Sequence, residues 1–216
     1  MPAQKRNYSR EQDEILREIG QSGKKPTLLL HVCCAPCSSY VLEHLTHYFS
    51  ISILYYNPNI EPEAEYDKRK AELERLVRSM PLENPVTLLP CEYDSQAFRE
   101  AAKGLEDVPE GGARCLACFR LRLRRAAEEA KKRGFDYFTT TLSISPLKNA
   151  EALNQIGEEA GREYGVAHLP SDFKKKEGYK RSIELSREYD LYRQDYCGCI
   201  YSKAQREKRK EEETCR

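Results

Sequence analysis

Tryptophan is absent from this chain of 216 residues, methionine occurs only twice, and no long apolar segment interrupts the charged sequence. A helix that crosses a bilayer needs roughly 20 predominantly apolar residues, so the sequence excludes a membrane span. The first 20 residues are polar and charged, unlike a secretory leader. We therefore expect a cytoplasmic protein with no membrane partner, in a compartment where disulfides are uncommon.

Glycine-rich cofactor motifs are also missing. The chain has 11 glycines, but none forms the Gly-x-Gly-x-x-Gly fingerprint of dinucleotide-binding proteins, and no flavin motif is present. Any redox chemistry would need another electron carrier, because no side chain alone is a reversible two-electron donor.

Cysteine, in contrast, is clustered. Seven of the nine cysteines lie in three short segments: Cys33-Cys34-Ala35-Pro36-Cys37, Cys115-Leu116-Ala117-Cys118 and Cys197-Gly198-Cys199. Thiols one to three residues apart can bind one metal, and three such segments supply more ligands than one tetrahedral ion can use. The pattern predicts an iron–sulfur cluster with a second metal beside it, although a structural zinc site explains the spacing equally well. Cys91 and Cys215 stand alone and are expected to be packing or surface residues.

Charge is balanced overall but uneven along the chain. The net charge is +1, yet residues 111–216 carry 23 Lys and Arg against 17 Asp and Glu. Basic residues concentrate in 114–125, 174–181 and 203–210. Such patches can follow a phosphate backbone, but solvated helix faces produce similar runs, and charge alone favours the solvated faces.

Apolar and β-branched runs alternate with helical patterns. Strands are predicted at 27–31, 49–56, 86–89, 135–142 and 166–169. Helices are predicted from Cys37 onward and at 61–78, 95–103, 116–133, 150–164, 182–189 and 200–213, with Gly134 ending one of them. This rhythm predicts an α/β fold with a doubly wound parallel sheet and C-terminal helices. We expect a single domain over 1–216, with a core of about 25–205, an N-terminal arm and a charged helical tail.

The predicted topology locates the chemistry. Ligands of open α/β sheets bind at the carboxyl ends of the strands, and Cys33-Cys34 follows the first strand directly. Residues 56–59 and 140–148 follow other strands and should share that rim. If the first strand continues, Cys33 and Cys34 point in opposite directions, which favours two separate metals. His31 borders the cluster, but a histidine that ends a buried strand is more often a core residue.

Several ordered motifs make the chain recognisable. They are residues 30–37, 56–60 with Glu65-Tyr66, 114–122, 139–149, 172–175 with Gly178, and 192–199. Together they resemble the QueH-type epoxyqueuosine reductases over roughly residues 25–205. The resemblance implies a Rossmann-like fold related to the PP-loop ATPases. Residues 33–37 stand where those ATPases have a glycine-containing phosphate loop, so ATP hydrolysis is disfavoured.

The resemblance also implies an activity: reduction of the epoxide of epoxyqueuosine in tRNA to the alkene of queuosine. The implied cofactors are a 4Fe–4S cluster and an additional mononuclear iron, supplied with electrons by an external donor. Our hypothesis assigns Cys115, Cys118, Cys197 and Cys199 mainly to the cluster. The extra iron is then assigned to Cys33, Cys34 and Cys37.

Proton donors and tRNA contacts complete the expected site. Asp195 and Tyr196 are the candidates for the general acid or for a further iron ligand, although Asp195 is also explained as a structural hydrogen-bond acceptor. Basic residues in or beside the motifs are candidate tRNA contacts: Arg114, Arg120, Arg122, Lys148, Lys174, Lys175 and Arg193. Aromatic residues that could stack on the base are Tyr56, Tyr66, Phe173 and Tyr192, each of which packing explains as well.

Two other functions fit part of the pattern. A zinc-stabilised RNA-binding module without catalysis explains the thiol pairs and the basic patches, but leaves three thiols without a task. A thiol–disulfide oxidoreductase would use Cys115 and Cys118 as a redox pair, and leaves the other clusters unexplained.

Overall fold

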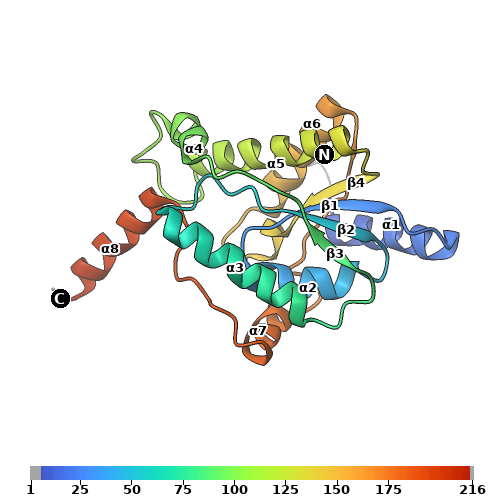
Figure 1. Ribbon diagram of the computed structural model, residues 1–216. Coiled ribbons are helices and arrows are strands. Elements are labelled where there is room, and N and C mark those ends of the chain that lie inside the picture. Colours follow the sequence, from blue (N-terminus) through green and yellow to red (C-terminus); the bar gives the residue numbers. More distant parts are fainter. Residues whose placement is uncertain (1–5, 215–216) are drawn as a thin grey trace.

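The structure, a computed structural model, describes residues 6–214, with side chains as far as Lys208 (Figure 1). A five-stranded sheet in the order β3-β2-β1-β4-β5 forms its centre, and every neighbouring pair is parallel. The strands are β1 Thr27–His31, β2 Ser50–Leu54, β3 Val86–Leu88, β4 Tyr137–Thr140 and β5 Ala167–His168. The chain order reverses beside β1, which confirms the predicted doubly wound α/β fold.

Helices cover both faces of the sheet (Figure 1). Their bounds are α1 Tyr8–Ser22, α2 Ala35–Leu45, α3 Glu63–Ser79, α4 Ser95–Ala102, α5 Ala113–Arg133, α6 Ala150–Tyr164, α7 Gly178–Glu188 and α8 Ile200–Thr214, with a short 3-10 turn η1 Thr141–Ile144. Core residues of α1, α2 and α3 pack on one face, and those of α5 and α6 on the other. In the described part of the chain, no helix combines the length and apolar character of a bilayer crossing.

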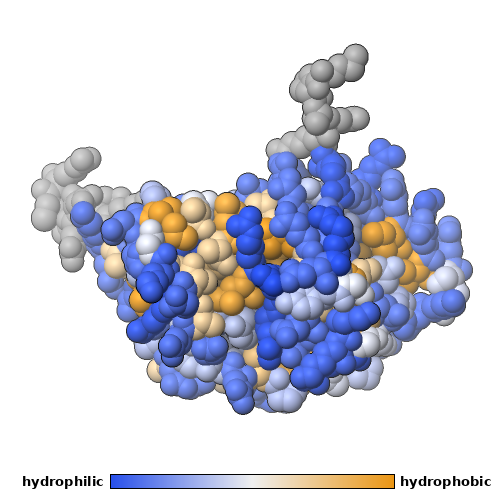
Figure 2. Space-filling view, turned by 90° about the horizontal axis from the view of Figure 1, so that it is seen from above, coloured by the Kyte–Doolittle hydropathy of each residue, from blue (hydrophilic) through white to orange (hydrophobic). Residues whose placement is uncertain are grey.

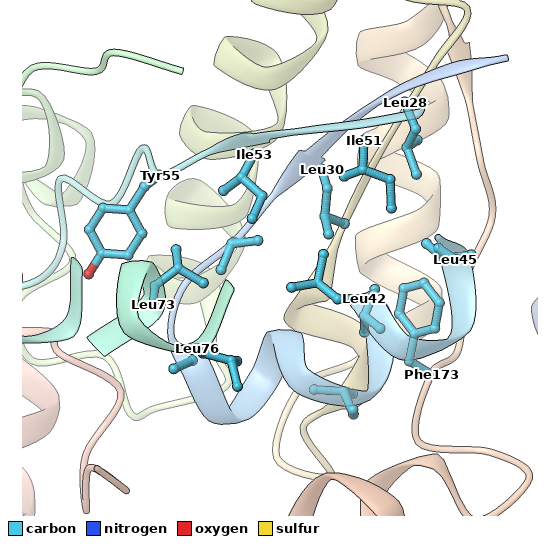
Figure 3. Close-up of a cluster of buried hydrophobic side chains, with 14 of the residues drawn as sticks. Leu28, Leu30, Leu42, Leu45, Ile51, Ile53, Tyr55, Leu73, Leu76 and Phe173 are labelled. Carbon is cyan, nitrogen blue, oxygen red and sulfur yellow. The ribbon is translucent and has the colours of Figure 1, made fainter. Parts of the chain in front are cut away.

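Successive side chains of β1 belong to two different hydrophobic cores, one on each face of the sheet. Leu28 and Leu30 belong to the cluster beneath the sheet, with Leu42 of α2 and Leu73 of α3 (Figure 3). Leu29 faces the opposite cluster on α5 and α6. Successive strand residues point to opposite faces, so an uninterrupted apolar strand buries both sides.

The N-terminal segment differs from the expected arm. Residues Tyr8–Ser22 form a helix whose Leu16 and Ile19 are buried against the main core. The Gln12 side-chain amide donates a hydrogen bond of 2.9 Å to the carbonyl of Pro170, which ties α1 to the segment after β5. This helix has few apolar residues, and they form one narrow face of an otherwise charged helix. The sequence pattern was therefore too weak to predict it.

Three predicted helices begin earlier than expected. α2 begins at Ala35 because the Cys34 sulfur caps its first turn, accepting from the Cys37 amide. α5 begins at Ala113, directly after Gly112, so Cys115 and Cys118 lie on its first turns. α7 begins at Gly178. Gly134 ends α5 in the left-handed conformation at φ 74°, as predicted.

Candidate metal centre

Six of the seven clustered cysteines line one cavity of about 420 Å³. They are Cys33, Cys37, Cys115, Cys118, Cys197 and Cys199. The three segments are far apart in sequence, but all of them line this cavity. The first lies between β1 and α2, the second at the start of α5, and the third in the loop before α8. Cys34 lies behind this wall, fully buried at the start of α2.

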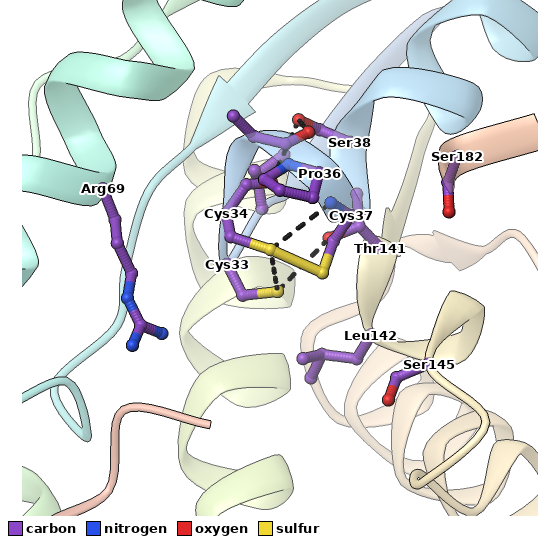
Figure 4. Close-up of a disulfide and its surroundings, with 12 residues drawn as sticks. Cys33, Cys34, Pro36, Cys37, Ser38, Arg69, Thr141, Leu142, Ser145 and Ser182 are labelled. Carbon is purple, nitrogen blue, oxygen red and sulfur yellow. Dashed lines mark hydrogen bonds between the residues drawn. A yellow bond between two sulfur atoms is a disulfide. The ribbon is translucent and has the colours of Figure 1, made fainter. Parts of the chain in front are cut away.

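The first cysteine segment forms a compact group of sulfurs (Figure 4). The Sγ atoms of Cys33, Cys34 and Cys37 lie within 4.8 Å of one another, a spacing that could hold a metal ion. β1 ends at His31, so the condition under which Cys33 and Cys34 would point in opposite directions is not met; their sulfurs are 3.7 Å apart. Sequence spacing assumed a longer strand, but the chain turns into α2 at once.

Cys34 and Cys37 are joined as a disulfide, in contrast to the expectation from the compartment. Cys34 is the N-cap of α2 and Cys37 lies in its first turn, so their Cα atoms are 5.4 Å apart. That separation is typical of bridged cysteines. Metal binding by these two residues requires the reduced pair, since thiolates are the ligands.

The second segment presents its sulfurs from the start of α5. The amide of Gly111 donates to the Cys115 sulfur at 3.2 Å. Burial raises the pKa of the Cys115 and Cys118 thiols. A bound metal reverses this preference, because coordination removes the thiol proton.

The third segment is held by the loop after β2. The Glu61 amide donates to the Gly198 carbonyl at 3.0 Å, and the Tyr196 hydroxyl donates to the Glu61 carbonyl at 3.0 Å. Gly198 has φ 103°, and a Cβ there would lie 2.7 Å from Ile60 Cγ1. Glycine is thus required between Cys197 and Cys199. A hydrogen bond with the Cys199 thiol lowers the pKa of Cys197.

A buried polar network joins the first two segments. Arg122, 3% exposed, places Nη2 at 2.5 Å from Asn57 Oδ1, Nε at 3.3 Å from His31 Nε2 and Nη1 at 3.9 Å from Cys118 Sγ. His31 is fully buried, and its Nδ1 lies 2.8 Å from Thr140 Oγ1. Burial and the Arg122 charge hold the pKa of His31 well below its usual range. His31 is therefore a neutral core residue, the simpler of the two interpretations.

Arg114 lies inside the protein, not on its outer surface. Its side chain is 1% exposed, and Nη1 donates to the loop carbonyls of Leu105, Glu106 and Val108. This arrangement explains how the glycine-rich loop in front of α5 is held. Arg114, a candidate tRNA contact from the sequence, thus lies in the wall of the cavity with very little exposed surface.

Of the other candidate tRNA contacts, Lys148 and Arg122 line the cavity. Arg120, Lys175 and Arg193 are exposed. Lys148 is half-buried and lines the cavity. Lys174 Nζ lies 2.6 Å from Asp172 Oδ1. Figure 2 shows that hydrophilic side chains cover much of one face, with apolar patches between them.

The two proton-donor candidates differ in accessibility. Asp195 lines the cavity with an exposed side chain, and its Oδ2 lies 3.3 Å from Arg206 Nη2. Tyr196 is half-buried, its hydroxyl is engaged with Glu61, and burial raises its pKa.

Sequence reasoning missed other residues of the cavity wall. They are Arg69, Phe98, Glu110, Phe119 and Ser202. Phe119 lies inside the motif at 114–122, so the sequence could have indicated that it belongs to the site. Of the candidate stacking residues, Tyr66 and Phe173 lie in the main core instead. Cys91 packs beside the second core, as expected of an isolated thiol, and Cys215 lies outside the described residues.

The donor set fits a thiolate-ligated metal. Sulfur ligands select iron–sulfur clusters, zinc or copper(I) over hard cations. A water molecule in the liquid occupies about 30 Å³, so a cavity of about 420 Å³ has room for more than a single ion. The site thus accommodates either a cluster or a zinc ion with a second ligand.

Comparison with known proteins agrees with this geometry. The profile of the family described as "Epoxyqueuosine reductase QueH" matches residues 28–205. A protein of that name from Streptococcus pyogenes serotype M1 is 42% identical over 203 residues, covering 93% of this chain and 80% of its own. The Staphylococcus epidermidis protein is 43% identical over 206 residues (94% and 87%), and that of Thermotoga maritima 37% over 183 (83% and 92%). The chain belongs to the epoxyqueuosine reductase QueH family.

Proposed function

We propose that this protein reduces the epoxide of epoxyqueuosine in tRNA to the alkene of queuosine. The observation that carries the proposal is the meeting of six thiols from three distant segments at one cavity, in a chain of this family. The reaction consumes two electrons and two protons, and the epoxide oxygen leaves as water. Electrons come from an external donor.

We assign Cys115, Cys118, Cys197 and Cys199 mainly to a 4Fe–4S cluster, and Cys33, Cys34 and Cys37 to an adjacent iron. A cluster held there would supply electrons one at a time, and an iron held by the first segment would supply Lewis acidity. The closeness of the three sulfurs of the first segment supports a separate ion there.

The chain itself must supply protons and hold the nucleotide. Asp195 is our candidate to relay a proton, because its carboxylate lies at the cavity and is exposed to solvent. Tyr196 is assigned to holding the third cysteine segment, since its hydroxyl is already engaged. Lys148, Arg120, Lys175 and Arg193 are the candidates to contact the phosphates that flank the modified base.

The decisive experiment is an anaerobic incubation of iron- and sulfide-reconstituted protein with tRNA that contains epoxyqueuosine and a chemical reductant, followed by nucleoside analysis. Conversion to queuosine supports the proposal. A colourless protein that carries zinc, binds tRNA and converts nothing would favour the zinc-stabilised RNA-binding module.

The proton relay has its own test. We expect Asp195→Asn to retain iron and sulfide while losing turnover about 100-fold, because general acid–base catalysis contributes on the order of 10²–10⁴. Full activity would remove Asp195 from the mechanism, and loss of iron would make it a ligand instead.

A further inference from the structure

Arg122 is a buried cation without a carboxylate. Its side chain is 3% exposed, and no acidic oxygen of the described residues lies within ion-pair distance of it; its polar neighbours are Asn57, His31 and Cys118. Burying an uncompensated charge costs several kcal/mol. Something in the cavity must therefore compensate the guanidinium.

Arg69 shows how this fold treats a comparable residue. It lines the same cavity and is 2% exposed, but its Nε lies 2.7 Å from Glu65 Oε1 on the same helix. One buried arginine thus has its own carboxylate within one helical turn. Arg122 has none, although α5 carries Glu128 and Glu129, which pair with Arg125 instead.

A second guanidinium in the cavity wall supports the same conclusion. Arg114 is 1% exposed, and its Nε and Nη2 have no hydrogen-bond partner among the described residues. Arg114 and Arg122 stand on α5 on either side of Cys115 and Cys118. Two buried cations on the helix that carries Cys115 and Cys118 indicate that the occupant of this cavity is negatively charged.

We propose that Arg122 is the counter-charge of an anionic, thiolate-ligated metal centre, and that its contact with Cys118 favours the reduced form of that centre. The inference rests on the proposed function. Thiolate ligands outnumber the positive charges of a cluster core, so the assembly is anionic, and each added electron makes it more so. Net charge and hydrogen bonds to the sulfurs are among the properties that set the potential of such centres.

The test compares Arg122→Met with the wild type in two states. Methionine keeps an unbranched side chain and removes the charge. In the metal-free protein, we expect the melting temperature to stay the same or rise, because an uncompensated cation is gone. In the loaded protein, we expect a smaller gain in melting temperature on metal uptake.

The potential is the second readout. At a fixed potential, we expect the ratio of reduced to oxidised centre to fall about tenfold in Arg122→Met, which equals about 59 mV for a one-electron couple. Arg122→Lys should recover part of the shift. Arg125→Met is the matched control, since it removes an exposed charge from the same helix, and it should leave the potential unchanged.

The outcomes separate this inference from the proposed function. An equal loss of stability in both states, with an unchanged potential, would make Arg122 a structural hydrogen-bond donor and overturn the inference alone. A wild type that takes up no metal would overturn the proposed function as well.

Discussion

The two ends of the parallel sheet treat their polar groups differently. At the amino end, Asp136 Oδ2 accepts from the Thr27 amide and hydroxyl at 2.8 Å, and the Asp136 amide donates back to Thr27 Oγ1 at 3.0 Å. At the carboxyl end, thiols and arginines line a cavity, and several buried polar atoms have no partner among the described residues. The amino end is complete by itself, and the carboxyl end is built for a ligand.

We expect the two ends of the sheet to contribute differently, the amino end to stability and the carboxyl end to function. Every polar group buried without a partner costs free energy, so a fold retains such groups where something else satisfies them. Substitutions at the carboxyl end should therefore alter metal binding more than stability, and substitutions elsewhere the reverse. Four predictions test the division, from the largest effect to the smallest.

Cys118→Ser should have the largest effect, at the carboxyl end. We expect activity to fall by more than about 100-fold, since even residues that only support a metal ligand cost 10–100-fold. Iron and sulfide per chain should fall with it. Cys91→Ser, which alters a thiol packed beside the second core, is the control and should keep its iron. A Cys118→Ser protein with full metal content would remove Cys118 from the ligands.

Leu30→Ala should lower the free energy of unfolding by about 2–5 kcal/mol. Leu30 is fully buried in the main core on β1, the central strand of the sheet. Urea unfolding measures the loss. Metal content per folded molecule should stay at the wild-type value. A loss of metal without a loss of stability would contradict the proposed division between stability and metal binding.

Gly198→Ala should cost about 1–3 kcal/mol because of its left-handed backbone and the clash with Ile60. The displaced segment should also lose metal. Gly104→Ala is the matched control, since Gly104 has φ 77° with open space around it. If both variants lose metal equally, backbone strain and not the close approach to Ile60 explains the effect.

Asp136→Asn should have the smallest effect, about 0.5 kcal/mol, because the residue is exposed. Hydrogen bonds from Thr27 lower the pKa of Asp136 below its ordinary value of 3.8. The stabilisation is therefore present above pH 3.8 and lost as the pH falls further. Urea unfolding of both proteins between pH 7 and pH 2.5 should show their stabilities converging in acid.

The sequence predicted the sheet well because its signals are local. Three consecutive leucines mark β1, and β-branched isoleucines mark β2. Parallel topology brings the segments after these strands to one edge. The first thiol segment follows β1 and lies at that edge, and the structure brings the other two segments to the same cavity. Burial of Arg114 and Arg122 was not predictable, since a charged helix face and a buried cation look alike in sequence. The engagement of Tyr196 depends on a loop contact 135 residues away, which spacing cannot reveal.

Long stretches of chain separate the three cysteine segments, and all three contribute residues to one cavity. A bound centre there would cross-link the start of α2, the start of α5 and the loop before α8, as structural metals do in small domains. Without a bound centre, the loop before α8 would lose that link to α2 and α5.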